Sequence, residues 1–240
     1  LMNFEGKDIR LKGYMIIIHD PKSIKVGYSS KMPVEGELTS GIAKRNGALA
    51  AINAGGFEYK SDNNSWTSTG GKCEGFIIHD GEVIINRLGS DTEKYLSIGF
   101  NSAGKLIFGD YSVNKLKSMG VNEAVCSFGP KLIVKGKKMF KDGDTGGLGY
   151  SPRTAIGQKA NGDVVFLVFE GRDLGSAGAS VSDLQQIMYE QGVVNAINLD
   201  GGSSTSMYFN GKMVNKPSNI MGERAVPSIF MVLQGEGSNK

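Results

Sequence analysis

Polar side chains gather in residues 198–206, directly after a β-prone apolar run. Asn198 and Asp200 are followed by Gly201-Gly202 and by hydroxyl side chains from 203 to 206. Strand alternation puts Asn198 and Asp200 on the same side of the chain, at the end where α/β sheets bind ligands. A tight turn that satisfies its own backbone also explains Asp-Gly followed by serines. A ligand site explains, in addition, the amide, the carboxylate and the two residues without side chains.

Three further segments place polar groups at the end of an expected strand. Asn53 follows an apolar run and precedes a glycine pair, which repeats the Ala-Ile-Asn and Gly-Gly pattern of the first segment. Glu170 and Arg172 follow residues 164–169, which are apolar on both faces and are therefore expected in the centre of a sheet. The candidate site residues are Asn53, Gly55, Gly56, Arg153, Thr154, Glu170, Arg172, Asn198, Asp200, Gly201, Gly202, Ser203 and Ser204.

These residue types favour acid-catalysed cleavage beside an anion. Two carboxylates, Asp200 and Glu170, are what glycoside cleavage needs, because one protonates the leaving oxygen and one acts as nucleophile or base. Arginine binds phosphate oxygens in bidentate fashion. Taken singly, Glu170 and Arg172 are also explained as partners of other charges of the chain.

Other chemistries fit the sequence less well. The serine run lacks the Gly-x-Ser-x-Gly elbow, and the glycines lack the lysine of a phosphate-binding loop. His19 and His79 stand outside any metal-ligand spacing. No cofactor is expected, although a hard divalent cation held by Asp200 and Glu170 stays an alternative.

The surrounding pattern predicts one α/β (α+β) domain over residues 1–240. Its 35 glycines lie mostly in turn signals between short apolar segments, which indicates many hairpins. We expect a mixed, largely antiparallel central sheet with short flanking helices. One helix is expected after a Thr39 cap, a second after Ser112, and a third from Ser182 with Gln185 completing a capping box.

Composition excludes several classes of protein. A net charge of +3 is too small for a nucleic-acid footprint, and no apolar run is long enough for membrane insertion. Cys73 and Cys126 are able to form a disulfide, but we favour free thiols. Trp66 lies in a long polar loop, where it either stacks on a sugar, covers the site or attaches the loop to the body. The given chain starts without a signal peptide, and the sequence does not indicate an oligomeric state.

Four motifs together resemble those of the phosphodiester glycosidase family. They are Asn53-Ala54-Gly55-Gly56-Phe57, Pro152-Arg153-Thr154-Ala155-Ile156-Gly157, Glu170-Gly171-Arg172 and Asn198-Leu199-Asp200-Gly201-Gly202-Ser203-Ser204. Their order and spacing agree over about residues 48–233. Two positions depart from the family pattern: Ser151 stands where histidine often precedes Pro-Arg-Thr, and Glu170 replaces the usual aspartate.

The resemblance implies a hydrolase that cleaves the glycosidic C–O bond of a sugar-1-phosphate diester, such as an N-acetylglucosamine-1-phosphodiester. Arg153 and Arg172 are then expected to bind the phosphodiester, and Asn53 and Asn198 to orient sugar hydroxyls. The alternatives are a binding module without turnover, which Ser151 favours, and a metal-dependent phosphodiesterase. The spread of the family suggests secretion or a role at a bacterial or phage cell envelope, on a glycan polymer.

Overall fold

The computed structural model describes residues 2–5, 11–58, 68–127, 129–173 and 176–234, arranged as three large antiparallel sheets and one two-stranded sheet. The seven-stranded sheet has the order β1 (Met2–Glu5), β2 (Lys12–Ile18), β14 (Val164–Phe169), β13 (Arg153–Lys159), β15 (Val193–Asn198), β11 (Lys131–Val134) and β12 (Lys137–Lys138). Every pairing between these strands is antiparallel.

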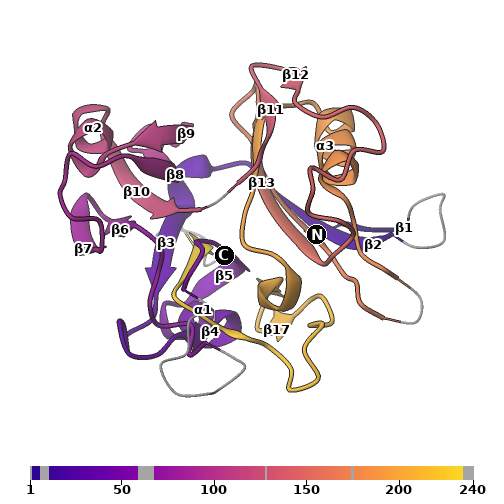
Figure 1. The fold of residues 1–240 in the computed structure, drawn as a ribbon, viewed down its shortest axis with the longest axis horizontal. Coiled ribbons are helices and arrows are strands. Elements are labelled where there is room, and N and C mark those ends of the chain that lie inside the picture. The colour runs from indigo at the N-terminus through magenta and orange to yellow at the C-terminus, as the bar shows by residue number, and fades with distance from the viewer. Residues whose placement is uncertain (1, 6–10, 59–67, 128, 174–175, 235–240) are drawn as a thin grey trace.

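Two five-stranded sheets stand beside it (Figure 1). The first, called here the β10 sheet, contains β7 (Glu82–Asn86), β6 (Phe76–His79), β10 (Val121–Cys126), β8 (Tyr95–Asn101) and β9 (Leu106–Tyr111). The second, called the β5 sheet, contains β17 (Lys212–Met213), β16 (Met207–Phe209), β5 (Ala48–Asn53), β19 (Ser228–Leu233) and β3 (Ile24–Tyr28). β18 (Ala225–Val226) and β4 (Glu37–Leu38) form the two-stranded sheet.

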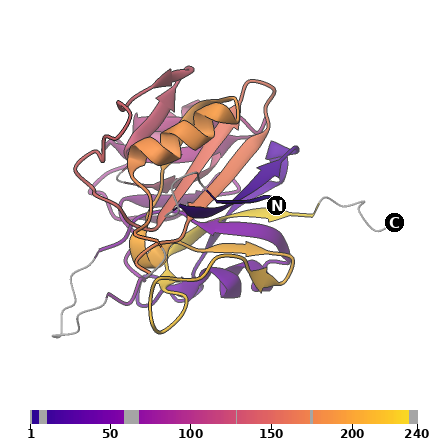
Figure 2. The same ribbon diagram turned by 90° about the vertical axis from the view of Figure 1, so that its right-hand side faces the viewer.

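Short helices cover the outer faces of the sheets. α3 (Val181–Glu190) crosses the seven-stranded sheet, as Figure 2 shows, and packs on β15 and β11. α1 (Thr39–Arg45) packs on β5, and α2 (Val113–Ser118) packs on β10. Two single-turn 3₁₀ helices occupy Pro21–Ser23 and Gly202–Ser204. No helix in the described ranges is long and apolar enough to cross a membrane.

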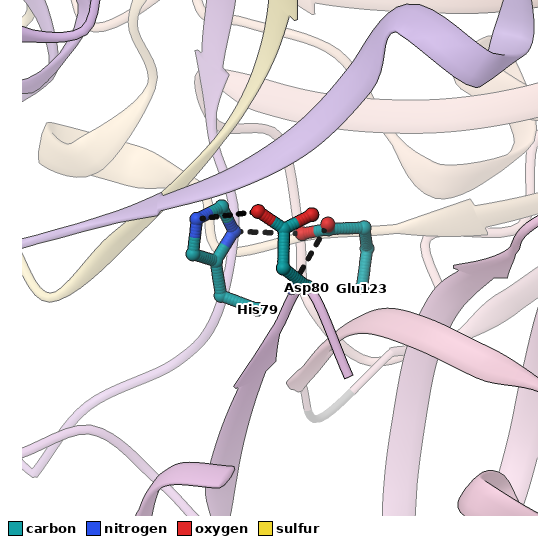
Figure 3. A group of neighbouring side chains, drawn as sticks. All are labelled: His79, Asp80 and Glu123. Atoms are coloured by element: carbon teal, nitrogen blue, oxygen red, sulfur yellow. Dashed lines mark hydrogen bonds and ion pairs between the residues drawn. The ribbon is translucent and has the colours of Figure 1, made fainter. Parts of the chain in front are cut away.

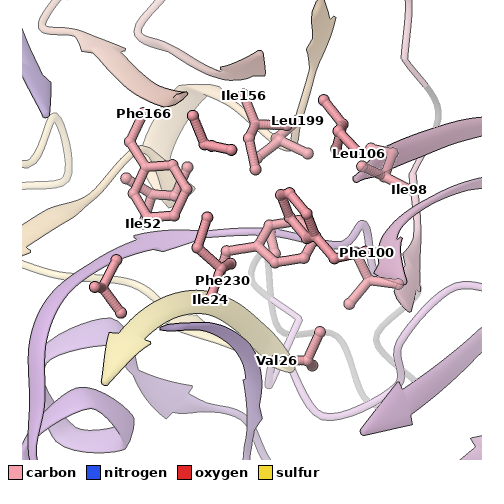
Figure 4. Close-up of a cluster of buried hydrophobic side chains, with 14 of the residues drawn as sticks. Ile24, Val26, Ile52, Ile98, Phe100, Leu106, Ile156, Phe166, Leu199 and Phe230 are labelled. Atoms are coloured by element: carbon pink, nitrogen blue, oxygen red, sulfur yellow. The ribbon is translucent and has the colours of Figure 1, made fainter. Parts of the chain in front are cut away.

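The main core lies where the three sheets meet (Figure 4). Phe166 of the seven-stranded sheet, Phe100 of the β10 sheet and Phe230 of the β5 sheet all point into it, and the last two rings stack edge to face. The continuous apolar run of β14 is explained by its two buried faces. Alternate residues enter this core, and the others enter a second core under α3. Burying both faces makes β14 a rigid platform for the residues that follow it.

The expected single domain of largely antiparallel sheet with hairpins and short helices is confirmed, although three sheets replace one central sheet. Turn signals placed the hairpins correctly. Asp80-Gly81 and Asn210-Gly211 both have positive φ at the two central positions, the pattern of a type I′ turn that matches strand twist. Ser112 caps α2 as expected, because its hydroxyl oxygen accepts a hydrogen bond from Lys115 N.

Two predicted helix caps are wrong. α3 is capped by Ser180, whose hydroxyl accepts from Asp183 N, while the Asp183 carboxylate accepts from Ser180 N at 2.8 Å. Gln185 instead reaches the segment just after β12, where its side-chain oxygen accepts from Met139 N. Thr39 is the first residue of α1 and not its cap. Its hydroxyl bonds the Ser206 hydroxyl at 2.6 Å, because burial demands a partner that the helix end does not supply.

Cys73 and Cys126 are buried free thiols, as expected. Burial raises the pKa of the Cys73 thiol to about 11 and also raises that of Cys126. Thiols in such apolar surroundings are poor nucleophiles. Trp66 lies outside the described residues.

Candidate active site

Three strand ends converge on the turn that follows β15. Leu199 N donates to Thr154 O at 2.8 Å and Gly202 N to Pro152 O at 2.8 Å, which ties the turn to the start of β13. Asp200 N donates to Ala54 O at 3.3 Å, just past the end of β5. The segments that the sequence marked are therefore brought together in space.

Asp200 is a buried carboxyl group at the centre of this convergence. The residue is 2% exposed, and its Oδ2 makes no hydrogen bond to the described part of the chain. Burial raises the pKa of Asp200 to about 7, against the opposing effects of the Ser204 hydroxyl, the Arg224 guanidinium and the Gly201 N–H. Ser204 Oγ, like Asp200 Oδ2, makes no hydrogen bond to the described residues. A carboxyl group with a pKa near 7 is suited to proton transfer at neutral pH.

Other buried polar atoms without a hydrogen-bond partner lie in the same turn as Asp200. Among the described residues they are Asn198 Oδ1, Ser204 Oγ and Thr205 Oγ1, and Ser218 Oγ is a further one in the loop that lines the neighbouring cavity. Buried polar groups are nearly always satisfied in folded proteins, and exceptions mark catalytic or binding sites. The concentration of such atoms in one turn and the loop beside it identifies this region as the candidate site.

The side chain of Asn53 holds this turn in place through hydrogen bonds. Its amide nitrogen donates to Asp200 O at 2.6 Å, and its amide oxygen accepts from the Thr154 hydroxyl at 2.7 Å and from Ser206 N at 3.1 Å. Asn53 and Thr154 are both 0% exposed. Because the Asn53 amide is used by the chain and shielded from solvent, the geometry favours a role in positioning Asp200 over the contact with sugar hydroxyls expected from the sequence.

Asn198 is similarly enclosed. Its amide nitrogen donates to Gly129 O and to Leu199 O, both at 2.7 Å, and the side chain is buried. Only its amide oxygen stays without a partner among the described residues. The expected contact with sugar therefore reduces to this one acceptor atom.

Arg153 differs from the expectation that it binds the phosphodiester. Its Nε donates to Ala179 O at 3.1 Å, and its Nη2 donates to Leu148 O at 3.0 Å and Gly149 O at 2.8 Å. Burial, together with the neighbouring Arg172, lowers the pKa of Arg153. The guanidinium holds backbone carbonyls of two loops in place, because in this buried position its donors must be satisfied locally.

Arg172 is the exposed guanidinium of the site. Its Nη2 donates to the Ser151 hydroxyl at 3.3 Å, and a Cβ atom added at Gly202 would lie 3.3 Å from the same nitrogen. Gly202 therefore leaves the space that the guanidinium occupies. Arg172 has a left-handed backbone with φ of 61°, which is unusual for a residue with a side chain. The side chain stands against Gly202 of the Asp200 turn.

The glycines at the site make room for neighbouring backbone. A Cβ at Gly55 would lie 2.9 Å from Cys126 O, and one at Gly201 would lie 2.9 Å from Pro152 O. Gly56 N donates to Cys126 O at 3.2 Å. Gly55 and Gly201 need to be glycine because neighbouring backbone packs closely there. The expected contact of Gly55, Gly56 and Gly201 with substrate stays a prediction.

Glu170 follows β14 at the edge of a cavity of about 560 Å³. Its Oε1 accepts from Lys216 N at 2.6 Å, and its Oε2 pairs with Lys12 Nζ at 3.1 Å. This pairing raises the pKa of Lys12. The cavity lies between residues 170–173 and 216–222, with Arg172 on its wall, and Asp200 is not part of its lining. Arg172 therefore connects the cavity to the Asp200 turn.

Arg224 is a site residue that the sequence analysis missed. Its Nη1 donates to the Ser203 hydroxyl at 2.8 Å, and its guanidinium carbon lies 4.9 Å from the centre of the Phe57 ring. Its charge acts on the Asp200 carboxyl group and lowers its pKa. No local motif surrounds Arg224, and only the path of the chain after β17 brings it to the turn.

A second group of carboxylates lies outside this site. The ligand atoms of His79, Asp80 and Glu123 are within 4.8 Å of one another (Figure 3). Lys25 Nζ pairs with Asp80 and lies 3.2 Å from Glu123 Oε1. An ammonium group thus already supplies the positive charge that a metal would bring. In the described ranges this is the one cluster of three such groups, and it contains neither Asp200 nor Glu170.

Comparison with known proteins agrees with this geometry. The family model described as phosphodiester glycosidase matches residues 46–233. An SPbeta prophage-derived protein of Bacillus subtilis is 30% identical over 220 residues, which is 86% of this chain and 30% of that protein. The bovine N-acetylglucosamine-1-phosphodiester alpha-N-acetylglucosaminidase is 38% identical over 69 residues, which is 29% of this chain and 13% of the enzyme. The chain thus spans less than a third of the length of these relatives.

Solved structures share the fold. The catalytic domain of the zebrafish N-acetylglucosamine-1-phosphodiester alpha-N-acetylglucosaminidase superposes with a TM-score of 0.75 at 23% identity, covering 98% of this chain and 81% of that one. An exported protein of Burkholderia pseudomallei superposes with a TM-score of 0.69 at 16% identity, covering 93% and 74%. The family match includes all four motifs, and the chain belongs to the phosphodiester glycosidase family.

Proposed function

We propose that the protein hydrolyses the glycosidic C–O bond of a sugar-1-phosphate diester, releasing the free sugar and a phosphomonoester. The observation that carries the proposal is Asp200, a buried carboxyl group with a pKa of about 7 whose Oδ2 has no partner among the described residues. The charge of Arg224 acts on this carboxyl group, and the Arg172 guanidinium lies against Gly202 of the same turn. Protonated, this group donates to the bridging oxygen. Arginines are suited to the negative charge of the phosphate.

The reaction needs two proton transfers. The C1–O bond breaks with its electron pair moving to the bridging oxygen, which takes the proton of Asp200. Water adds to C1 and gives its proton to a carboxylate. The leaving phosphomonoester is an anion that Arg172 stabilises at the edge of the cavity.

Glu170 is our candidate for the second carboxylate. It lines the cavity with Arg172, and the Lys12 ammonium and the Lys216 N–H both stand against its oxygens. These two contacts fix the orientation of the carboxylate. Whether Glu170 attacks C1 directly or activates water decides between retention and inversion of the anomeric configuration.

The substrate class that we propose follows the names of the related enzymes. The bovine and zebrafish enzymes are named for N-acetylglucosamine-1-phosphodiesters. We therefore propose an N-acetylglucosamine-1-phosphodiester as the probe substrate, and a glycan phosphodiester as the natural one. The prophage relative favours a phage or bacterial glycan, and the names of the relatives do not specify the group on the second ester of the phosphate.

The test is hydrolysis of UDP-N-acetylglucosamine in oxygen-18 water, with and without chelator, with mass spectrometry of the quenched products. We expect unlabelled UDP and labelled sugar, with no effect of the chelator. A standard of free N-acetylglucosamine in the same water corrects for exchange at C1. Label in the phosphate, or loss of activity with chelator, would establish a metal-dependent phosphodiesterase, and binding without turnover would establish a binding module.

A further inference from the structure

One loop, residues 216–224, is attached to the candidate site at both ends. Its first residue, Lys216, donates its backbone N–H to Glu170 Oε1 at 2.6 Å. Its last residue, Arg224, donates to the Ser203 hydroxyl beside Asp200 at 2.8 Å. Glu223 also accepts from Ser40 N at 2.9 Å, at the start of α1. The loop is therefore placed relative to both carboxyl groups by named contacts.

The middle of this loop presents two large apolar side chains to solvent. Ile220 is 100% exposed and Met221 is 86% exposed, which exceeds every other large hydrophobic residue in the described ranges. The turn beneath them is ordered by Asn219, whose side-chain oxygen accepts from Met221 N at 3.0 Å and whose carbonyl accepts from Gly222 N at 2.9 Å. Adjacent exposed apolar side chains on an ordered turn are typical of a binding surface.

The cavity joins this apolar surface to the charged part of the site. Glu170 and Arg172 line one side, and Pro217 and Ile220 line the side formed by the loop. The Lys216 ammonium is engaged by Asp173 at 2.7 Å on the rim. The cavity thus combines a cation suited to a phosphate with an apolar wall, which matches the chemistry of an amphiphilic anion.

We propose that the 216–224 loop binds the group on the far ester of the phosphate, and that this group is apolar, such as an alkyl or isoprenoid chain. The inference rests on the proposed function. A phosphodiester has two ester arms, and the sugar arm must lie toward Asp200 for its bridging oxygen to be protonated. With the phosphate at Arg172, the other arm enters the cavity and runs along Pro217 and Ile220. The substrate class is then a sugar-1-phosphate esterified to a hydrophobic alcohol.

The test compares two esters of N-acetylglucosamine-1-phosphate that differ only in the second alcohol, methyl or decyl, below the micelle concentration of the decyl ester. Calorimetry measures binding to the Asp200→Asn protein, and product release measures hydrolysis by the wild type. We expect the decyl ester to bind about tenfold more tightly, from the apolar surface that it removes from water. The double variant Ile220→Ser, Met221→Ser should lower that ratio to about twofold.

Val34→Ser is the matched control, because Val34 is 76% exposed but lies outside the cavity lining. It should keep the binding ratio of the wild type. Equal binding of the two esters, or a ratio that the double variant leaves unchanged, would overturn the inference. Retention on neutral lipid vesicles without preference for the decyl ester would also overturn it, since the loop would then contact a bilayer and not a substrate. Absence of hydrolysis of both esters contradicts the proposed function only, because the binding ratio is measured independently.

Discussion

Two buried carboxyl groups of this protein stand in opposite environments. Glu123 on β10 has partners for both oxygens: Oε2 accepts from Val26 N at 2.8 Å and from His79 at 3.1 Å, and Oε1 accepts from Asp80 N at 3.1 Å and pairs with Lys25. These contacts join β3 of one sheet to β6 and β10 of another. Glu123 thus acts as a structural carboxylate that connects two sheets.

Asp200 is as deeply buried but is left partly unsatisfied. Its Oδ2 has no partner in the described part of the chain, and the polar atoms near it include further acceptors and donors without one. Burial consequently dominates its pKa, which rises to about 7. Glu123 and Asp200 are therefore alike in burial and differ in whether both carboxyl oxygens have partners among the described residues.

The largest effect is expected on stability, from replacing Glu123. Glu123→Gln leaves Lys25 and His79 without their buried negative partner, and removal of one member of a buried ion pair costs about 3 kcal/mol. Urea denaturation should show this loss in the free energy of unfolding. The control is Glu82→Gln, at an exposed carboxylate of β7, which should change stability by less than about 0.5 kcal/mol. A stable Glu123→Gln protein would mean that the contacts of Glu123 are not what joins the two sheets.

For Asp200, the proposed acid, the expected loss is in catalytic turnover. Asp200→Asn keeps the shape and removes the proton donor, so turnover should fall by at least about 100-fold. The free energy of unfolding at pH 7.5 should not fall, because a buried charge that costs stability is removed with it. Initial rates and urea denaturation on the same preparation measure both. Turnover within a few-fold of the wild type excludes Asp200 as the acid.

The pH dependence of stability separates the two regions further. The folded-state pKa of Asp200 is raised to about 7, so stability rises as pH falls from 7 toward 4 and this carboxyl group takes up its proton. Between pH 7.5 and 5.5 the gain is on the order of 2 kcal/mol, and Asp200→Asn should remove it. The pKa of Asp80 is lowered, chiefly by Lys25, so its contribution is present at neutral pH and is lost only as pH falls through that lowered pKa. Identical slopes for wild type and Asp200→Asn would contradict the raised pKa.

The smallest effect concerns Arg224. Its positive charge lowers the pKa of Asp200, so Arg224→Gln should raise that pKa by at least about half a unit. Activity that requires a protonated acid declines as pH rises through this pKa, and the decline should move to higher pH in Arg224→Gln. Arg224→Lys keeps the charge and should keep the wild-type profile. Lower activity with an unmoved profile would assign Arg224 a structural role only.

The sequence predicted the strands and their polar ends well, because those signals are local. Alternating apolar residues and Asn-Gly or Asp-Gly turns identify hairpins within a few residues of one another, and the Asp200 turn was identified from its own composition. The misplaced cap of α3 arose because two serines, at 180 and 182, each had a polar residue three positions later.

The remaining features depend on contacts between distant segments. Arg153 and Arg172 are equivalent by composition, yet one donates to backbone carbonyls and the other faces the cavity. Arg224 reaches Ser203, and Lys216 N reaches Glu170, only after the chain has folded three sheets around the core. The spacing of residues in the sequence predicts neither the direction of a side chain nor the hydrogen-bond partner of a buried donor.

The left-handed backbone of Arg172 has a consequence for engineering the protein. That conformation costs about 1 kcal/mol for a residue with a side chain and almost nothing for glycine. A stabilised version chosen by backbone preference alone would therefore replace Arg172 with glycine and discard the exposed guanidinium of the site. Under the proposed function, position 172 is one where selection for thermal stability and selection for substrate turnover favour different residues.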